Sequence, residues 1–232
     1  MNSRHIGIVG VSAEGAALCY RTICAEGEGL LGPHDHPEVS LHTHPLARYM
    51  ECIDEGDWRG VAELMLSSVH KLQAAGADFV ICPDNTVHQA LRFIEERSPL
   101  PWLHIADVVA EEARRRGFRK LGLTGTRWLV ESDVYPERLD SRGLAWERPA
   151  PEDREAINRI IMDELVRGVI SETAVAEFQR IIAALEGRGC EAVILGCTEI
   201  PLLMNDGNSP LPTLDSTRLL ARVALARAVS RH

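Results

Sequence analysis

The chain has 232 residues, 45% of them hydrophobic, which is enough to build a core in one large domain or two small ones. A net charge of −9 without a basic cluster argues against nucleic acid as a partner. There is no apolar run of transmembrane length, no secretory leader and no C-x-x-C spacing among the six cysteines. We therefore expect a cytoplasmic protein with free thiols and no membrane partner.

The first half of the chain alternates between short apolar runs and amphipathic stretches. The apolar runs, bounded by turn residues, predict strands at 5–11, 39–44, 78–82 and 101–105. Apolar residues at helical spacing predict helices at 14–26, 58–75, 86–96 and 106–117.

The second half continues the same alternation. It predicts strands at 120–126, 143–149 and 191–196. It predicts helices at 154–168, 173–189 and 217–229. Strands separated by helices of this length indicate an α/β protein with parallel sheets and helices on both faces.

Two pairs of segments along the chain are similar to each other. Residues 75–86 align with 188–199, which places Asp84 opposite Cys197 at an offset of 197 − 84 = 113. The run that starts at Ile6 is similar to the run that starts at Leu121, at an offset of 121 − 6 = 115. A repeat at about half the chain length predicts two similar α/β halves.

Ligands of parallel α/β sheets bind beyond the carboxyl ends of the strands, so polar residues at these ends are candidates for the site. The candidates are Ser12, Asp84–Asn85–Thr86, Thr124, Thr126 and Cys197–Thr198–Glu199. Hydroxyls and the free N–H groups of helix starts are suited to a small anionic ligand. Neither a G-x-G-x-x-G nor a Walker A pattern is present, which argues against a nucleotide.

Cys197 and Asp84 are the candidate proton-transfer groups. Cys197 follows an apolar strand and precedes a predicted helix start, where the pKa of a thiol falls below about 8.5; the alternative is a buried core cysteine. Asp84 on its own resembles an N-cap, but its position opposite Cys197 favours a catalytic role. If the two halves face each other, both groups approach one substrate from opposite sides, which is what inversion of a stereocentre requires.

Four histidines and one arginine lie close together in the segment that follows the first helix. The histidines have no accompanying cysteine or carboxylate cluster with ligand spacing, so we expect no metal. His42 and His44 share one face of a predicted strand and border the site in one interpretation. Arg48 follows them and either pairs bidentately with a substrate carboxylate or has a surface role.

Several segments, in this order, resemble the cofactor-independent aspartate/glutamate racemase superfamily. They are IGIVGVSAEGAALCYRTI, ICPDNTVH, LHIAD, LTGTR, INRIIMDEL and ILGCTEIPLL. The resemblance runs from Ile6 to about Asp215, and ILGCTEIPLL is its most specific part. It is closest to the aspartate racemase and broad-specificity amino-acid racemase branch, because glutamate racemases usually have CTH where this chain has Cys197-Thr198-Glu199.

The resemblance implies two Rossmann-like domains with parallel sheets, pseudo-two-fold symmetry and the substrate in the cleft between them. We place the first domain at 1–98 plus 208–232 and the second at 99–207. The resemblance also implies a homodimer that uses neither pyridoxal phosphate nor a metal, so the expected cofactors are none.

The sequence departs from the superfamily at one catalytic position. The second motif, Gly-Cys-Thr, is intact at Gly196–Cys197–Thr198, but the first, typically Cys-Asn-Thr, is Asp84-Asn85-Thr86. A solvated carboxyl has a pKa of about 3.9 against about 8.5 for a thiol, so Asp84 is the weaker base unless burial raises its pKa. Asp84 is therefore either a base or an anchor for a substrate ammonium group.

The leading hypothesis is an amino-acid racemase or epimerase that exchanges the Cα proton of a small amino acid through Asp84 and Cys197. In it, Asn85, Thr86, Thr126 and Thr198 hold the α-carboxylate, and the further substrate contacts are Ser12, Arg48 and Glu199. A second hypothesis is a single-cysteine lyase or isomerase of a small carboxylate. A third is a ligand-binding protein that has lost the chemistry.

Overall fold

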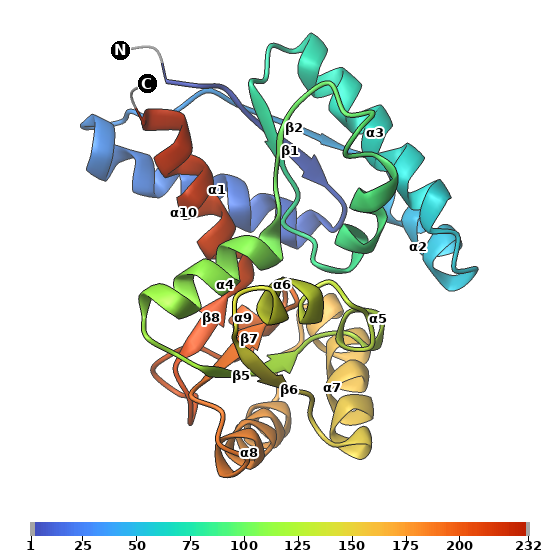
Figure 1. Ribbon diagram of the computed structural model, residues 1–232, viewed down its shortest axis with the longest axis vertical. Helices are drawn as coiled ribbons and strands as arrows, with labels where there is room; N and C mark the ends of the chain where they lie inside the picture. The colour runs from blue at the N-terminus through green and yellow to red at the C-terminus, as the bar shows by residue number, and fades with distance from the viewer. Residues whose placement is uncertain (1–2, 231–232) are drawn as a thin grey trace. The chain divides into compact units, whose positions relative to one another are not determined.

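The computed structural model describes residues 3–230, which divide into two compact units (Figure 1). One unit runs up to Ile105 and resumes at Thr217, and the other is Ala106–Ser216. Each unit contains one four-stranded parallel sheet with helices between the strands. The predicted α/β class with two parallel sheets is therefore confirmed.

The sheet of the first unit has the order β2-β1-β3-β4, and neighbouring strands are parallel. Its strands are β1 Ile6–Gly10, β2 Val39–Thr43, β3 Phe79–Ile81 and β4 Trp102–Leu103. Ile8 of β1 is in register with Leu41 on one side and Ile81 on the other. All residues of β1 and β3 are buried, which explains why their sequences are continuous apolar runs.

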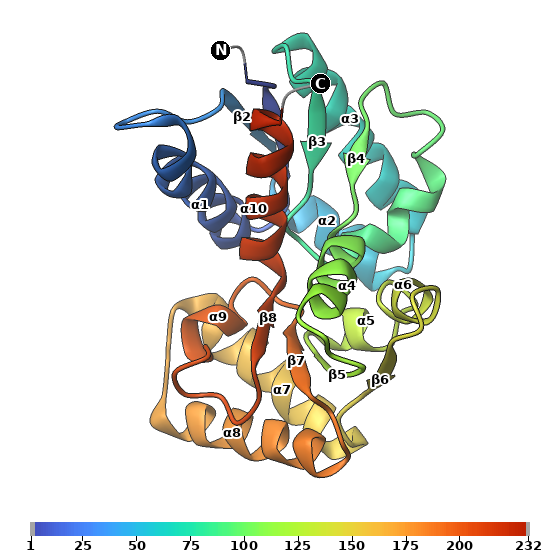
Figure 2. The same ribbon diagram turned by 60° about the vertical axis from the view of Figure 1, so that its left-hand side comes forward.

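Helices cover both faces of the first sheet. They are α1 Ala13–Leu31, α2 Leu46–Asp54, α3 Trp58–Ala74, the 3₁₀ helix η1 Thr86–Phe93 and α10 Ser216–Val229. The connection from β1 to β2 and that from β2 to β3 run in opposite directions along the sheet, so right-handed crossovers place α1 and α3 on opposite faces. Arg222 of α10 forms an ion pair with Glu26 of α1, which places these two helices side by side (Figure 2).

The sheet of the second unit has the equivalent order, β6-β5-β7-β8. Its strands are β5 Lys120–Thr124, β6 Ala145–Glu147, β7 Ala192–Leu195 and β8 Thr213–Asp215. The helices are α4 Ile105–Arg115, α5 Arg127–Val130, α6 Pro136–Asp140, α7 Pro151–Asp163, η2 Leu165–Arg167, α8 Glu172–Gly187 and α9 Ile200–Leu203. One apolar cluster joins α7, α8 and β7 and includes the side chains of Phe178, Ile182 and Leu185.

The sequence repeat corresponds to a structural repeat within the two sheets. Asp78, before β3, accepts the N–H of His5, and its counterpart Glu191, before β7, accepts the N–H of Arg119. Each acid thereby binds the start of the neighbouring central strand. Gly76 and Gly189 precede them with φ values of 94° and 83°, a conformation that glycine adopts without steric cost.

Several predicted elements differ from the observed ones. The segment 86–96 is a 3₁₀ helix that ends at Phe93, and the α-helix predicted at 154–168 ends at Asp163 before η2. Helix α1 continues five residues beyond the predicted end at Glu26. Helix α2 and strand β8 were not predicted. No helix within residues 3–230 combines the length and apolar content needed to cross a bilayer.

Candidate active site

Three strands of the first sheet end at residues that the sequence identifies as site candidates. Ser12 follows β1, caps α1 and accepts the N–H of Gly15 at 3.2 Å. His44 follows β2, and the Asp84–Asn85–Thr86 turn follows β3. The carboxyl ends of parallel strands lie at one edge of a sheet, so these residues lie along the edge where α/β proteins bind ligands.

The Asp84 side chain is held by its own turn. Its Oδ1 accepts the backbone N–H of Thr86 at 3.2 Å, at the start of η1. Asn85 is only 2% exposed. The carboxylate is thus fixed at the end of β3 in the manner of a helix-capping residue, which is compatible with either role predicted for it.

Cys82 lies two residues before Asp84 and is the one thiol in this turn. Its side chain is fully buried, and its Sγ lies 3.9 Å from the carbonyl oxygen of Asp84. Burial, and then the charge of Asp84, raise the pKa of the Cys82 thiol well above its ordinary value. The raised pKa favours the protonated thiol, and it is Asp84, not Cys82, that aligns with Cys197 in the sequence repeat.

His42 and His44 lie on one face of the chain at the end of β2, as their spacing predicts. Their ring centroids are 4.9 Å apart, and each ring hydrogen-bonds to a serine of α3: His42 to Ser68 at 2.9 Å and His44 to Ser67 at 3.2 Å. Burial, and then the charge of Lys71, lower the pKa of both histidines. Within residues 3–230, no three or more His, Cys, Asp or Glu side chains are grouped as metal ligands would be.

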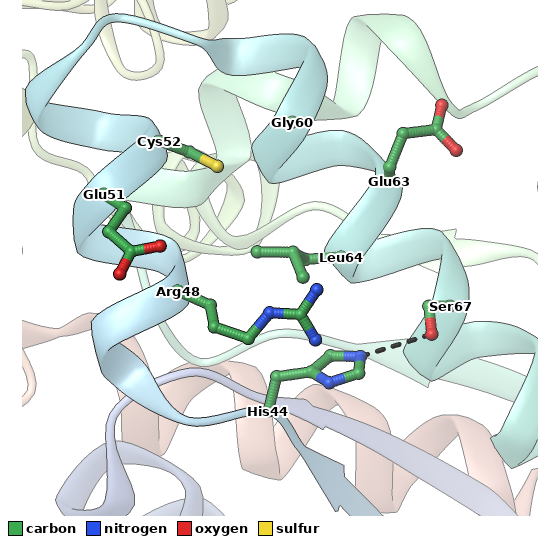
Figure 3. A pocket seen from close by; sticks show the side chains of 8 residues that line it. All are labelled: His44, Arg48, Glu51, Cys52, Gly60, Glu63, Leu64 and Ser67. Carbon is green, nitrogen blue, oxygen red and sulfur yellow. Dashed lines mark hydrogen bonds between the residues drawn. The ribbon is translucent and has the colours of Figure 1, made fainter.

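Arg48 lines a pocket of about 320 Å³ between α2 and α3 (Figure 3). The eight lining residues are His44, Arg48, Glu51, Cys52, Gly60, Glu63, Leu64 and Ser67. Figure 3 shows the guanidinium of Arg48 extending into the pocket beside the His44 ring. Among the described residues no carboxylate forms an ion pair with Arg48, whereas Glu63 is paired with Arg97. The donors of Arg48 are therefore available to a carboxylate ligand.

In the second unit, the candidate residues gather after β7. The thiol of Cys197 donates to Oε2 of Glu199 at 2.9 Å, and the hydroxyl of Thr198 donates to the same oxygen at 2.7 Å. All three are buried, with exposures of 8% for Cys197, 4% for Thr198 and 7% for Glu199. Within the described residues no cation forms an ion pair with Glu199, and the thiol and the hydroxyl are hydrogen-bond partners of its Oε2. The sequence interpretation treated Glu199 as a substrate contact and missed its bond to Cys197.

The backbone around Cys197 is closely packed. A Cβ atom on Gly196 would lie 2.6 Å from the carbonyl oxygen of Thr124 and 2.5 Å from Leu129, so only glycine fits between β7 and the end of β5. Thr126 begins α5 at this end of β5, in an extended conformation. Helix α9 begins only at Ile200 and has four residues, so Cys197 lies three residues before a single helical turn. The Glu199 carboxylate is in contact with the thiol.

The fold and this site define an α/β protein of two units, each with one parallel sheet, that carries a thiol hydrogen-bonded to a carboxylate at a strand end. A model of the Asp/Glu/hydantoin racemase family matches residues 7–224. The chain belongs to this family. The resemblance found in the sequence is thereby confirmed.

The matches to individual relatives cover different shares of the relatives' lengths. The chain is 32% identical to a glutamate racemase of Thermus thermophilus over 66% of its own length and 56% of the relative's length. It is 23% identical to a broad-specificity amino-acid racemase of Bacillus subtilis over 86% of this chain and 85% of that one. The chain thus spans little more than half of the Thermus protein but most of the Bacillus protein.

Two solved structures are similar over nearly their full length. A Yersinia pestis protein proposed to be an Asp/Glu racemase is 35% identical, with a TM-score of 0.91, over 98% of this chain and 100% of that one. An aspartate racemase homologue from Pyrococcus horikoshii is 28% identical, with a TM-score of 0.86, over 99% of this chain and 100% of that one.

Proposed function

We propose that this protein is an amino-acid racemase or epimerase that exchanges the Cα proton of a small amino acid without pyridoxal phosphate or a metal. The observation that carries the proposal is the hydrogen bond from the Cys197 thiol to the buried Glu199 carboxylate. Membership of the Asp/Glu/hydantoin racemase family supports it. The names of the similar proteins, which include aspartate, glutamate and broad-specificity racemases, favour an amino-acid substrate.

The Cys197–Glu199 pair supplies a proton-transfer group. Only the thiolate removes a proton from carbon effectively, and a carboxylate 2.9 Å away accepts the thiol proton as the thiolate forms. The thiolate then takes the Cα proton and leaves the electron pair on the substrate. Glu199 is buried and accepts a second hydrogen bond, from Thr198. Its carboxylate is therefore held in position to accept the thiol proton.

Inversion needs a second group that delivers a proton to the other face of Cα, and Asp84 is our candidate. In this direction the Asp84 carboxyl donates its proton to the carbanion, and in the reverse direction its carboxylate removes the Cα proton while Cys197 donates. The alternative is that Asp84 binds the substrate ammonium group. The bond from the Thr86 N–H fixes the Asp84 carboxylate in either case.

The remaining candidate residues are donors that suit a carboxylate. We assign the substrate α-carboxylate to Asn85, Thr86, Thr126 and Thr198, with Ser12 as a further contact. Arg48 is the candidate for a second, side-chain carboxylate, because its guanidinium extends into a pocket and forms no ion pair in the described chain (Figure 3). An acidic amino acid is therefore the favoured substrate.

The experiment is a panel of single enantiomers of aspartate, glutamate and small neutral amino acids, followed by chiral chromatography. The proposal expects the opposite enantiomer to appear with at least one acidic substrate, in protein dialysed against a chelator and free of pyridoxal phosphate. Loss or isomerisation of a carboxylate substrate without inversion would favour the single-cysteine lyase or isomerase. Binding without any turnover would favour a ligand-binding protein.

We also propose that the protein works as a homodimer in the cytoplasm. All six cysteines are free, which supports a reducing compartment. The dimer rests on the family resemblance alone and stays a prediction. Light scattering of the purified protein tests it, because a dimer gives twice the mass of one chain.

A further inference from the structure

A second cavity lies in the other unit, between α5 and α7. Its volume is about 450 Å³, and its lining residues are Arg127, Glu131, Pro151, Arg154, Glu155, Asn158 and Arg159. Helix α5 follows β5 and α7 follows β6, and these two strands are neighbours in the sheet. The cavity therefore lies near the carboxyl ends of β5 and the edge strand β6, where parallel sheets bind ligands.

This cavity and the Arg48 pocket of the first unit each lie beside the helix that follows an edge strand. The Arg48 pocket lies beside α2, which follows the edge strand β2, and β2 and β6 occupy the same place in the two strand orders. The two cavities are not counterparts in the repeat, because the Arg48 pocket lies between α2 and α3, whereas this cavity lies between α7 and α5, the helix that follows the central strand β5. The two lining sets share no residue, and neither includes Asp84 or Cys197.

The arginines of the second cavity have donors that no acceptor among the described residues uses. Within residues 3–230, neither Arg127 nor Arg159 forms an ion pair with a carboxylate. Arg127 lies over the Trp128 ring, at 4.6 Å from its centroid. The Nε of Arg154 is buried without a hydrogen-bond partner, and its Nη1 is 3.5 Å from Glu131. A buried donor without an acceptor is costly, and a bound oxyanion would satisfy it.

Charge and rigidity favour an anion here. Three arginines and two glutamates line the cavity, so its formal charge is 3 − 2 = +1 in a chain whose net charge is −9. Asn158 accepts the backbone N–H of Arg127 at 3.0 Å and so ties α5 to α7. Guanidinium groups match the geometry of carboxylate and phosphate oxygens and bind them bidentately. We propose that this cavity binds a small oxyanion, a phosphate or dicarboxylate group.

The experiment is calorimetric titration of the intact protein with sodium phosphate and, separately, sodium malonate at constant ionic strength. We expect saturable binding of at least one anion at this cavity, in addition to any malonate that the proposed substrate pocket of Arg48 binds. Binding of phosphate would indicate a phosphate ester as the natural ligand, and binding of malonate would indicate a dicarboxylate. Arg154→Gln and Arg159→Gln should each weaken binding about tenfold, because a hydrogen bond to a charged group is lost.

The matched control is Arg114→Gln, and Arg48→Gln reports any anion that binds the proposed substrate pocket instead. Arg114 is exposed on α4 in the same unit and does not line the cavity, so its loss removes the same charge and should leave binding within about twofold. Circular dichroism verifies that each variant is folded. The proposal is wrong if neither anion saturates, or if Arg114→Gln weakens binding as much as the cavity variants. It is also wrong if Arg48→Gln abolishes binding while the cavity variants retain it.

Discussion

The thiol of Cys197 and the carboxylate of Glu199, two positions apart in one tight turn, are joined by a hydrogen bond of 2.9 Å. Both side chains are buried, and Thr198 between them donates to the same carboxylate oxygen. The turn after β7 therefore brings a proton acceptor directly to the thiol. This arrangement gives the proposed racemase a way to form a thiolate inside an apolar cluster.

The first prediction concerns this bond. Glu199→Gln keeps the shape and can still accept a hydrogen bond but cannot take the thiol proton, so kcat should fall by about 100-fold. Exchange of the Cα proton from the enantiomer that Cys197 deprotonates, followed by NMR in D₂O, should slow in parallel. The exposed Glu186→Gln is the control and should change neither rate. An unchanged exchange rate in Glu199→Gln would show that Glu199 does not activate the thiol.

The second prediction concerns Asp84. If Asp84 is the second base, as we favour, Asp84→Asn should abolish proton removal from one enantiomer, while exchange through Cys197 on the other enantiomer survives. Asp84→Cys should restore or increase turnover in both directions, because it supplies the second thiol of the family motif. A rise in KM in both directions with little change in kcat would make Asp84 an ammonium anchor. No effect at all would reduce it to the residue that caps the Thr86 N–H.

The third prediction concerns the Arg48 pocket. Arg48→Gln should raise KM for an acidic amino acid by about tenfold with a smaller effect on kcat, because a bidentate contact to the side-chain carboxylate is lost. The KM for a neutral amino acid should hardly change. Arg59→Gln, an exposed arginine that lies over Phe93 in the same unit, is the control. Equal losses for acidic and neutral substrates would contradict the assignment.

The fourth prediction is a pH dependence of stability. The pKa values of His42 and His44 are lowered in the folded protein by burial and by Lys71, so the unfolded chain binds protons more readily. The free energy of unfolding should therefore decrease as the pH falls from about 7 through about 6.5, the pKa of an unfolded histidine, to the lowered pKa values of the folded protein. Below those values the contribution of the two histidines no longer changes with pH.

Urea unfolding between pH 5 and 7.5 measures this slope. The double variant His42→Gln, His44→Gln should flatten it, while His70→Gln, an exposed histidine of α3, should not. The assignment fails if His70→Gln changes the slope as much as the double variant.

Local signals predicted the regular elements well where they agreed with packing. Helix α3 was predicted at 58–75 and is observed at Trp58–Ala74, because Asp57 caps it and its apolar residues recur at helical spacing. Helix α1 extends beyond its predicted end through Gly27, where helix propensity is low. A Cβ at Gly27 would lie 2.7 Å from the Cβ of His36, so this glycine permits close packing within a helix that continues.

The missed features depend on tertiary context. Strand β8 has only three residues and follows Pro212, so its own sequence gives little strand signal, and it exists because it pairs with β7. The strand-end rule identified Cys197 and Glu199 as site residues. It could not predict their hydrogen bond, because that bond depends on side-chain directions within one turn rather than on residue types. The residues that line the cavity of Arg154 form no sequence motif, because they come from two separate helices and the residues beside them.

Deuterium incorporation at Cα is the most direct test of the central claim. Each pure enantiomer of the best substrate is incubated with the protein in D₂O, and NMR measures the deuterium at Cα. Wild-type protein should introduce deuterium from both enantiomers, with inversion, and Cys197→Ala should fold normally and lose inversion by a factor of about 1,000 or more. A folded Cys197→Ala variant that inverts and exchanges at near wild-type rates would contradict the account.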